Sequence, residues 1–230
     1  MKVARMFRVL LWWATAVAVG LGSAWAVLRS VSNYSVAAGP WRASALAGSP
    51  EADLYTRARV ALGGLLALNR EETMYYVAST DSAGQPLRAR CSYRVTGVPP
   101  KARWWSVTAY AQDLFLFDNP ARRYSVNGQT AVLDAQGRFA FVSGPVAPVS
   151  LMAGGVAPVA TVPTAASAPG ALAAAVPSPR APSSGAVPWI PTPAEGGLFF
   201  TLRVYNPESS LSAAPGTLQA PKIELVGGCP

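Results

Sequence analysis

Three arginines, Arg88, Arg90 and Arg94, form the densest group of side chains that could bind a ligand. They alternate with apolar residues, so in an extended strand the three guanidinium groups would lie on one face. A guanidinium group binds carboxylate or phosphate through two parallel hydrogen bonds, which makes this face a candidate anion or glycan site. The alternative is a solvated face whose arginines pair with Asp or Glu on neighbouring strands.

The segment 103–110, RWWSVTAY, supplies a second candidate binding surface. Its aromatic and β-branched residues predict a strand at the centre of a sheet. Trp104, Trp105, Tyr110 and Tyr124 are candidates for stacking on sugar rings. In an alternating strand Trp104, Ser106, Thr108 and Tyr110 share a face, where a polar pocket could form. Burial of the rings in a hydrophobic core is the alternative.

Two carboxylates, Glu72 and Asp118, are candidates for acid and base catalysis, with Arg94 as a charge stabiliser. A pair of positioned carboxylates can hydrolyse a glycosidic bond. This pattern predicts an exported hydrolase that acts on a glycan or an ester. Carboxylates at such spacing are also common on protein surfaces, and ordinary surface charge is the alternative.

Other chemistry is excluded by composition. The chain contains no histidine, which removes Ser-His-Asp, Cys-His and histidine-zinc sites. It has no P-loop, G-x-S-x-G, S-x-x-K or calcium-loop motif, so we expect no cofactor and no metal. The net charge of +8 suggests a nucleic-acid partner, but four basic residues surround one apolar segment and the remaining excess is small. We therefore expect no nucleic acid.

Residues 9–28 contain no charged side chain, and as a helix they would span roughly 30 Å, the thickness of a bilayer core. Lys2, Arg5 and Arg8 precede this segment, and the excess of positive charge predicts a cytoplasmic N-terminus. Residues 1–29 are therefore predicted to be a single-pass anchor in the inner membrane, with the following domain in the periplasm and the lipid bilayer as a partner.

Two alternatives to the anchor remain open. The sequence Ala24-Trp25-Ala26 could be the cleavage site of a signal peptide, which would export the domain without anchoring it. The apolar segment could also be a buried helix of a soluble protein.

The next two segments are predicted to connect the anchor to the domain and to cover a sheet. Residues 30–48 are predicted to be an extended arm, and Ser49 is expected to be the N-cap of a helix over residues 50–68. Apolar residues recur on one face of this helix, which is therefore expected to pack on a sheet. They are Leu54, Ala58, Ala61, Leu65 and Leu68.

The predicted domain covers residues 49–230. After Asn69 its apolar and polar residues alternate with a period of two, which is typical of strands. Strands are predicted at 73–80, 87–96, 103–110, 114–117, 124–126, 130–133, 139–142, 198–205 and 222–226. Asp81–Gly84 and Asp134–Gly137 have the Asp-first, Gly-fourth pattern of a type I turn. Proline, alanine and valine dominate the intervening stretch, and residues 145–186 are predicted to be a disordered insertion.

Cys91 and Cys229 are the only cysteines in the chain. In an oxidising periplasm they could form a disulfide that attaches the C-terminus to the sheet. Cys91 lies on the apolar face of its predicted strand, so a buried free thiol is the alternative.

Four motifs of the chain are the most specific for a family assignment: Gly39-Pro40-Trp41, Leu68-Asn69-Arg70, Ala102 to Tyr110 and Leu202 to Pro207. Together with the N-terminal anchor they resemble a bacterial envelope family catalogued as domain of unknown function 1214, in its stand-alone, membrane-anchored form. The resemblance covers residues 39–128 and 188–226, and the chain departs from the family between Gly144 and Val187.

The resemblance implies a jelly-roll-like antiparallel β-sandwich with one packed helix, and it implies no established activity. The leading hypothesis is therefore a mainly β, membrane-anchored envelope module that binds an unidentified ligand or protein without catalysis. The exported hydrolase is the competing hypothesis.

Overall fold

The computed structural model describes residues 2–30, 35–44, 46–62, 68–148, 187–227 and 229. Of the predicted disordered insertion at 145–186, residues 149–186 lie outside the described residues.

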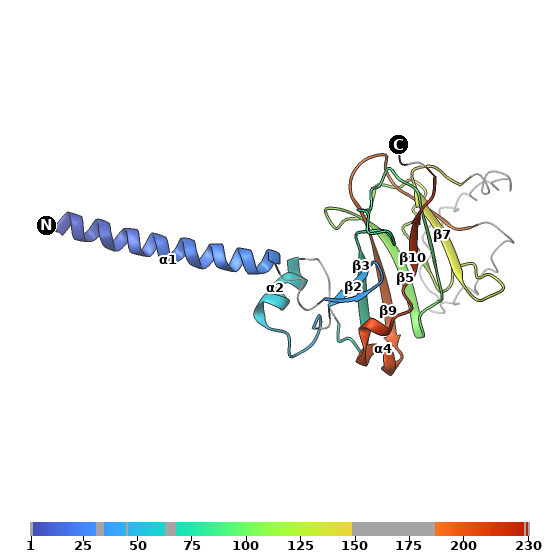
Figure 1. Cartoon of the computed structure of the whole chain (residues 1–230), viewed down its shortest axis with the longest axis horizontal. Coiled ribbons are helices and arrows are strands. Elements are labelled where there is room, and N and C mark those ends of the chain that lie inside the picture. Colours follow the sequence, from blue (N-terminus) through green and yellow to red (C-terminus); the bar gives the residue numbers. More distant parts are fainter. Residues whose placement is uncertain are drawn as a thin grey trace, which may run out of the picture.

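The N-terminal helix α1 (Lys2–Ser30) extends away from the sheets (Figure 1). Its stretch Ala4–Leu28 is long and apolar enough to cross a membrane. Large apolar side chains along this stretch are exposed, among them Leu10, Trp12 and Leu21. The rest of the described chain therefore does not bury α1 as it would bury a core helix.

A six-stranded antiparallel sheet forms one layer of the domain. Its strands, in spatial order, are β1 (Ser35–Ala38), β2 (Trp41–Ser44), β3 (Thr73–Ala78), β9 (Leu198–Pro207), β5 (Ala102–Ala111) and β6 (Ser125–Asn127). The predicted central strand is β5, and it pairs with β9 along nearly its whole length.

The predicted extended arm is instead the β1–β2 hairpin at the edge of this sheet. Its two-residue turn places Gly39 at a φ of 57°, a conformation that glycine adopts without steric cost. Trp41 is fully buried, and its Nε1 donates a hydrogen bond to the carbonyl of Pro221 at 2.7 Å. The arm prediction was wrong because this long-range contact fixes the segment to the domain.

A four-stranded sheet forms the second layer. Its order is β10 (Lys222–Leu225), β4 (Tyr93–Gly97), β7 (Phe139–Gly144) and β8 (Trp189–Pro191), and only β7 and β8 are parallel among these described strands. The predicted strand at 87–96 begins only at Tyr93. The mainly β fold with two sheets and few helices is confirmed.

One hydrophobic core contacts the inner faces of both sheets. Trp105 of β5 lies with its ring 4.6 Å from that of Phe139, and Phe200 of β9 meets Phe141 edge-on at 6.1 Å. Because these residues alternate along their strands, the intervening side chains form outer faces that point away from the core. Those outer faces are the surfaces on which a ligand could bind.

The helix after the hairpin, α2 (Leu54–Leu62), is shorter than predicted and has a different cap. The Oδ1 atom of Asp53 accepts hydrogen bonds from the backbone N–H of Tyr55 and Thr56, at 2.8 and 2.9 Å. The Thr56 bonds lower the pKa of Asp53. Ser49 instead accepts a bond from Glu51 in a preceding turn, so the predicted N-cap was wrong.

The predicted packing of this helix on the sheet was also wrong. Of the face that was expected to be covered, Leu54 is 81% exposed, Ala61 is exposed and Ala58 is half-buried. Of the other expected residues, Leu65 lies outside the described residues and Leu68 is 40% exposed.

Two short predicted strands are loops. Residues 114–117 form a turn in which the Ala111 N–H bonds to the Phe115 carbonyl, and Leu114 has a φ of 73°. Of residues 130–133, only Leu133 forms an isolated bridge. Both predicted Asp-x-x-Gly turns are confirmed by bonds from the Gly84 and Gly137 N–H groups. Helices α4 (Ser209–Ala213) and η1 (Pro215–Thr217) were not predicted.

Candidate functional site

The outer face of the six-stranded sheet brings aromatic, hydroxyl and guanidinium side chains together. Opposite residues of antiparallel strands share a face, so the β5–β9 register places Trp104 beside Tyr205, Ser106 beside Arg203 and Tyr110 beside Phe199. On the other side of β9, Tyr75 lies opposite Arg203. We call this group the Arg203 platform: Tyr75, Trp104, Tyr110, Phe199, Arg203 and Tyr205.

Neutral groups hold the half-buried guanidinium of Arg203. Its Nη2 donates to the Tyr110 hydroxyl at 2.7 Å, and its Nη1 lies 3.4 Å from the Thr108 hydroxyl. The guanidinium carbon also lies 5.4 Å from the centre of the Tyr110 ring, a cation–π distance. These contacts fix the orientation of the cation without neutralising its charge.

Among the described residues, no carboxylate lies within 4 Å of that guanidinium. The only ion pair within 4 Å among the described residues joins Lys101 to Glu208. None of the six strands of the sheet contains Asp or Glu, whereas Arg42 adds a second cation to the outer face, opposite Val77. The platform is therefore positively charged, which favours anionic ligands.

Aromatic pairs lie on both sides of Arg203 along the sheet. The Trp104 and Tyr205 rings are 5.1 Å apart, and the Tyr110 and Phe199 rings stack at 5.6 Å. Burial raises the pKa of Tyr75, as does nearby Tyr205, and the Arg203 charge only partly opposes this rise. Tyr75 therefore remains a neutral hydroxyl near neutral pH.

The carboxylates of the hydrolase hypothesis do not belong to this group. Glu72 immediately precedes β3, at the end of the sheet where Thr73 pairs with Tyr205. Asp118 is exposed in the loop that leaves β5 after Ala111, at the opposite end of the sheet.

The third member of that hypothesis, Arg94, lies in the other sheet on β4. Three cavities lined by described residues contain none of Glu72, Asp118 and Arg94. The structure thus separates the groups that joint catalysis would require.

The predicted common face of Arg88, Arg90 and Arg94 was wrong. Arg88 and Arg90 lie in a turn before β4, closed by a bond from the Cys91 N–H to the Arg88 carbonyl. Arg94 lies directly opposite Glu224 on β10, as expected for a solvated face with cross-strand charges.

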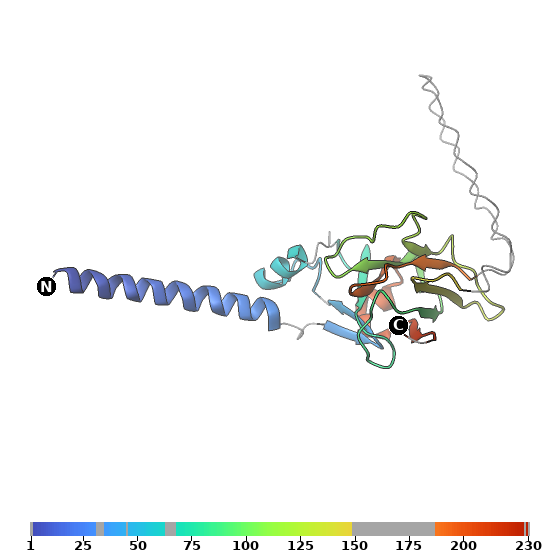
Figure 2. The same ribbon diagram turned by 90° about the horizontal axis from the view of Figure 1, so that it is seen from above.

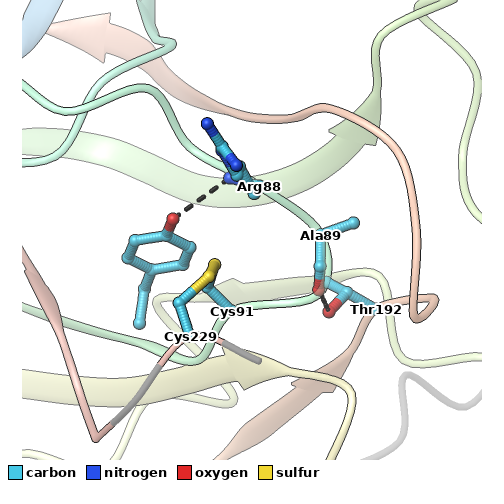
Figure 3. Close-up of a disulfide and its surroundings, with 6 residues drawn as sticks. Arg88, Ala89, Cys91, Thr192 and Cys229 are labelled. Carbon is cyan, nitrogen blue, oxygen red and sulfur yellow. Dashed lines mark hydrogen bonds between the residues drawn. A yellow bond between two sulfur atoms is a disulfide. The ribbon is translucent and has the colours of Figure 1, made fainter.

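A disulfide and two side-chain bonds fix this turn (Figure 3). Cys91 is bonded to Cys229, with Cα atoms 4.7 Å apart, so the free-thiol alternative was wrong. The Tyr93 hydroxyl accepts a bond from the Arg88 N–H at 3.1 Å, and the Thr192 hydroxyl donates to the Ala89 carbonyl at 2.6 Å. The disulfide and the Thr192 bond are long-range contacts, and they hold in a turn a segment whose sequence alternates like a strand.

Sequence reasoning placed Trp104, Ser106, Thr108 and Tyr110 on one face, in agreement with the register. It missed Arg203 and the aromatic residues of β9. The available signal was a single arginine at an alternate position of a strongly apolar strand, LFFTLRVYNP. Its partner strand could not be identified from the sequence alone.

Comparisons with known proteins find a family but no activity. The model of the family "Protein of unknown function (DUF1214)" matches residues 72–155 and 159–209, more than half of the chain. No match is found among curated proteins.

Solved structures give a likeness of fold. The chain is similar to the VPA0106 protein from Vibrio parahaemolyticus, with a TM-score of 0.51 and 20% identity, over 78% of this chain and 37% of that one. An uncharacterised protein from Burkholderia cenocepacia matches at a TM-score of 0.39 and 13% identity, over 67% of this chain and 29% of that one. The chain thus spans about a third of the length of these two proteins.

Proposed function

This chain belongs to DUF1214, a family of proteins of unknown function, and we propose that it is a membrane-anchored envelope module that binds an acidic saccharide on the Arg203 platform. The ligand is a sugar ring that carries a carboxylate, such as a uronic acid residue. Binding occurs without catalysis, because the strands of the platform carry no carboxylate that could act as an acid or base.

The observation that carries this proposal is the half-buried guanidinium of Arg203, which has hydroxyl and ring neighbours but no carboxylate within 4 Å among the described residues. Partial burial weakens the hydration of a charge, and an anion from solution would replace what is lost. Guanidinium binds carboxylate in two parallel bonds, and its planar geometry selects carboxylate over a spherical ion.

The aromatic pairs supply the second half of the recognition. Trp104 and Tyr205 on one side of Arg203, and Tyr110 and Phe199 on the other, offer ring faces and edges beside the cation. A sugar ring placed over either pair would bury apolar C–H groups while its carboxylate reached Arg203. In this proposal the two sheets form a jelly-roll-like sandwich whose broad outer face presents the platform.

The same proposal places the domain in the periplasm. The apolar stretch Ala4–Leu28 is long enough to cross the inner membrane, and the three basic residues before Val9 favour a cytoplasmic N-terminus. The Cys91–Cys229 disulfide supports an oxidising compartment. Alkaline extraction of membranes, with protease protection of spheroplasts, tests this placement.

Binding is tested on the full chain in lipid nanodiscs by calorimetry, with glucuronate and galacturonate oligomers and matched neutral oligomers. We expect acidic oligomers to bind and Arg203→Gln to weaken them about 10-fold to 100-fold, since hydrogen bonds to charged groups contribute about 1.5–3 kcal/mol. Trp104→Ala should also weaken binding. Arg94→Gln is the matched control and should leave binding unchanged. Equal affinity for neutral and acidic oligomers would falsify this ligand class.

A further inference from the structure

Helix α2 carries an apolar stripe that no described part of the domain covers. At about 100° per residue its apolar residues fall within an arc of about 120°. They are Leu54, Tyr55, Ala58, Ala61 and Leu62. Leu54 is 81%, Leu62 70% and Tyr55 46% exposed, so the largest side chains of the stripe lie in the open.

The opposite side of α2 packs on the turn that precedes the helix, and this packing sets the direction of the stripe relative to that turn. Thr56 is buried on that side, and Val60 is half-buried and lines a cavity with the preceding turn. Arg57 donates from Nε to the Ala52 carbonyl at 2.9 Å and from Nη2 to the Pro50 carbonyl at 3.0 Å. Rotation of the helix about its axis, which would turn the stripe inward, would break these contacts.

Helix α2 lies beside the C-terminal end of α1, as both views of the molecule show (Figures 1 and 2). Within residues 4–28 of α1, only Ala24 and Leu28 are partly covered. They are four residues apart, which is about 6 Å of helix axis, and they lie at the end of the apolar stretch Ala4–Leu28 beside which α2 lies.

We propose that α2 is an interfacial helix that buries its apolar stripe in the outer leaflet of the bilayer that α1 crosses. This inference rests on the membrane anchoring proposed above. An interfacial helix sinks its apolar face about 5–10 Å into the boundary between headgroups and acyl chains, which matches the position of α2 beside the last residues of the apolar stretch Ala4–Leu28. Tyr55 and Trp25 then lie at the level where aromatic side chains are enriched.

The bilayer fits the stripe better than a protein partner does, because α1 continues the same apolar surface into the membrane. With α2 in the interface, the domain is held at two points instead of one. The attachment then limits the rotation of the sheets about the axis of α1, and the Arg203 platform keeps a fixed orientation relative to the membrane.

Environment-sensitive labels on the full chain test this placement in vesicles of phosphatidylethanolamine and phosphatidylglycerol. A single added cysteine, Leu54→Cys or Leu62→Cys, carries an NBD fluorophore while the Cys91–Cys229 disulfide stays intact. Leu133→Cys, on an exposed loop residue of the domain, is the matched control. Val17→Cys, in the middle of α1, reports the anchor itself.

We expect lipid-chain nitroxides to quench positions 54, 62 and 17, and aqueous iodide to quench position 133 alone. If positions 54 and 62 respond to iodide while position 17 responds to lipid, the anchor stands and the interfacial helix is refuted. If position 17 responds to iodide, the anchoring proposal itself fails. Protection of position 54 without lipid quenching, with crosslinks between copies, would assign the stripe to a second chain and overturn the inference.

A second measurement does not depend on labels. Hydrogen exchange of the α2 amides in nanodiscs should become at least tenfold faster in the variant Leu54→Gln/Leu62→Gln, because the stripe would no longer favour the interface. Leu133→Gln should leave these amides unchanged. Equal exchange in both variants would contradict the proposal.

Discussion

The outer faces of the two sheets differ in the way they carry charge. On the four-stranded sheet, Arg94 lies exposed and directly opposite Glu224, as expected for a solvated surface with both signs of charge. On the six-stranded sheet, Arg203 is half-buried between aromatic rings, and no strand of that sheet contains an acid. Both sheets, however, pack on the same core.

This difference separates the requirements of folding from those of binding. The shared core constrains only the inward residues, and outward positions can vary with little effect on stability. A solvated pair such as Arg94 and Glu224 needs no further explanation. A partly buried cation without a carboxylate partner gives the fold no evident advantage, so the platform is the better candidate for a selected function.

The largest expected effect is a loss of the core that both faces share. Phe200 is fully buried, and it joins the sheets by its edge-on contact with Phe141. We expect Phe200→Ala to lower the free energy of unfolding by about 3–5 kcal/mol, because it leaves a cavity between the layers. Urea denaturation followed by fluorescence and circular dichroism should show one transition for both sheets.

Phe115→Ala is the matched control, because Phe115 is 72% exposed in the loop after β5. Its substitution should change the free energy of unfolding by less than about 0.5 kcal/mol. Two separate transitions in either protein would mean that the two sheets unfold independently. Their outer faces could then no longer be compared as parts of one domain with a shared core.

The disulfide should affect the two faces unequally. It attaches residue 229, after β10, to the turn before β4, with a sequence separation of 138 residues. We expect Cys229→Ser to lower the free energy of unfolding by about 2–4 kcal/mol. Dithiothreitol should destabilise the natural chain by the same amount and leave the variant unchanged.

Binding to the platform should survive this change, because the disulfide lies at the edge of the other sheet. Affinity of Cys229→Ser for acidic oligomers should stay within about twofold of the natural chain under conditions where both are folded. A parallel loss of affinity would show that the platform depends on the four-stranded sheet.

The sequence predicted most of the secondary structure that local patterning controls. The strands β3, β5, β9 and β10 and both Asp-x-x-Gly turns follow from alternation and turn chemistry. The β1–β2 hairpin could not be predicted in this way, since its burial depends on the bond from Trp41 to Pro221 across 180 residues.

The candidate site was predicted only in part, for a related reason. Alternation along β5 is local, and it grouped Trp104 with Tyr110. The meeting of Arg203 with Tyr110 depends on the β5–β9 register, which the sequence does not reveal. An apolar face of α2 was recognised, but its direction depends on the packing of Arg57 and Val60 against the preceding turn and not on the pattern itself.

A smaller effect distinguishes a binding cation from a structural one. We expect Arg203→Met to leave the free energy of unfolding unchanged or to raise it by about 1 kcal/mol, because an apolar side chain of similar length suits a half-buried site. The same variant should lose binding to acidic oligomers. Arg94→Met on the solvated face should change neither quantity. A loss of more than about 2 kcal/mol in Arg203→Met would assign Arg203 to the fold.

The smallest effect concerns the pH dependence of Tyr75 on the platform. Burial raises its pKa above the ordinary value of about 10, so the folded state disfavours the phenolate. Its contribution to stability is fully present below pH 10 and is lost as the pH rises through the folded pKa. Between pH 9 and pH 11 the natural chain should therefore lose more free energy of unfolding than Tyr75→Phe. The difference in free energy of unfolding between the two proteins at pH 7 is the internal control.

The Arg203 charge opposes the rise in the pKa of Tyr75. Arg203→Met should therefore move the Tyr75 titration, followed by absorbance, to higher pH. Movement to lower pH would contradict the interaction between the two side chains.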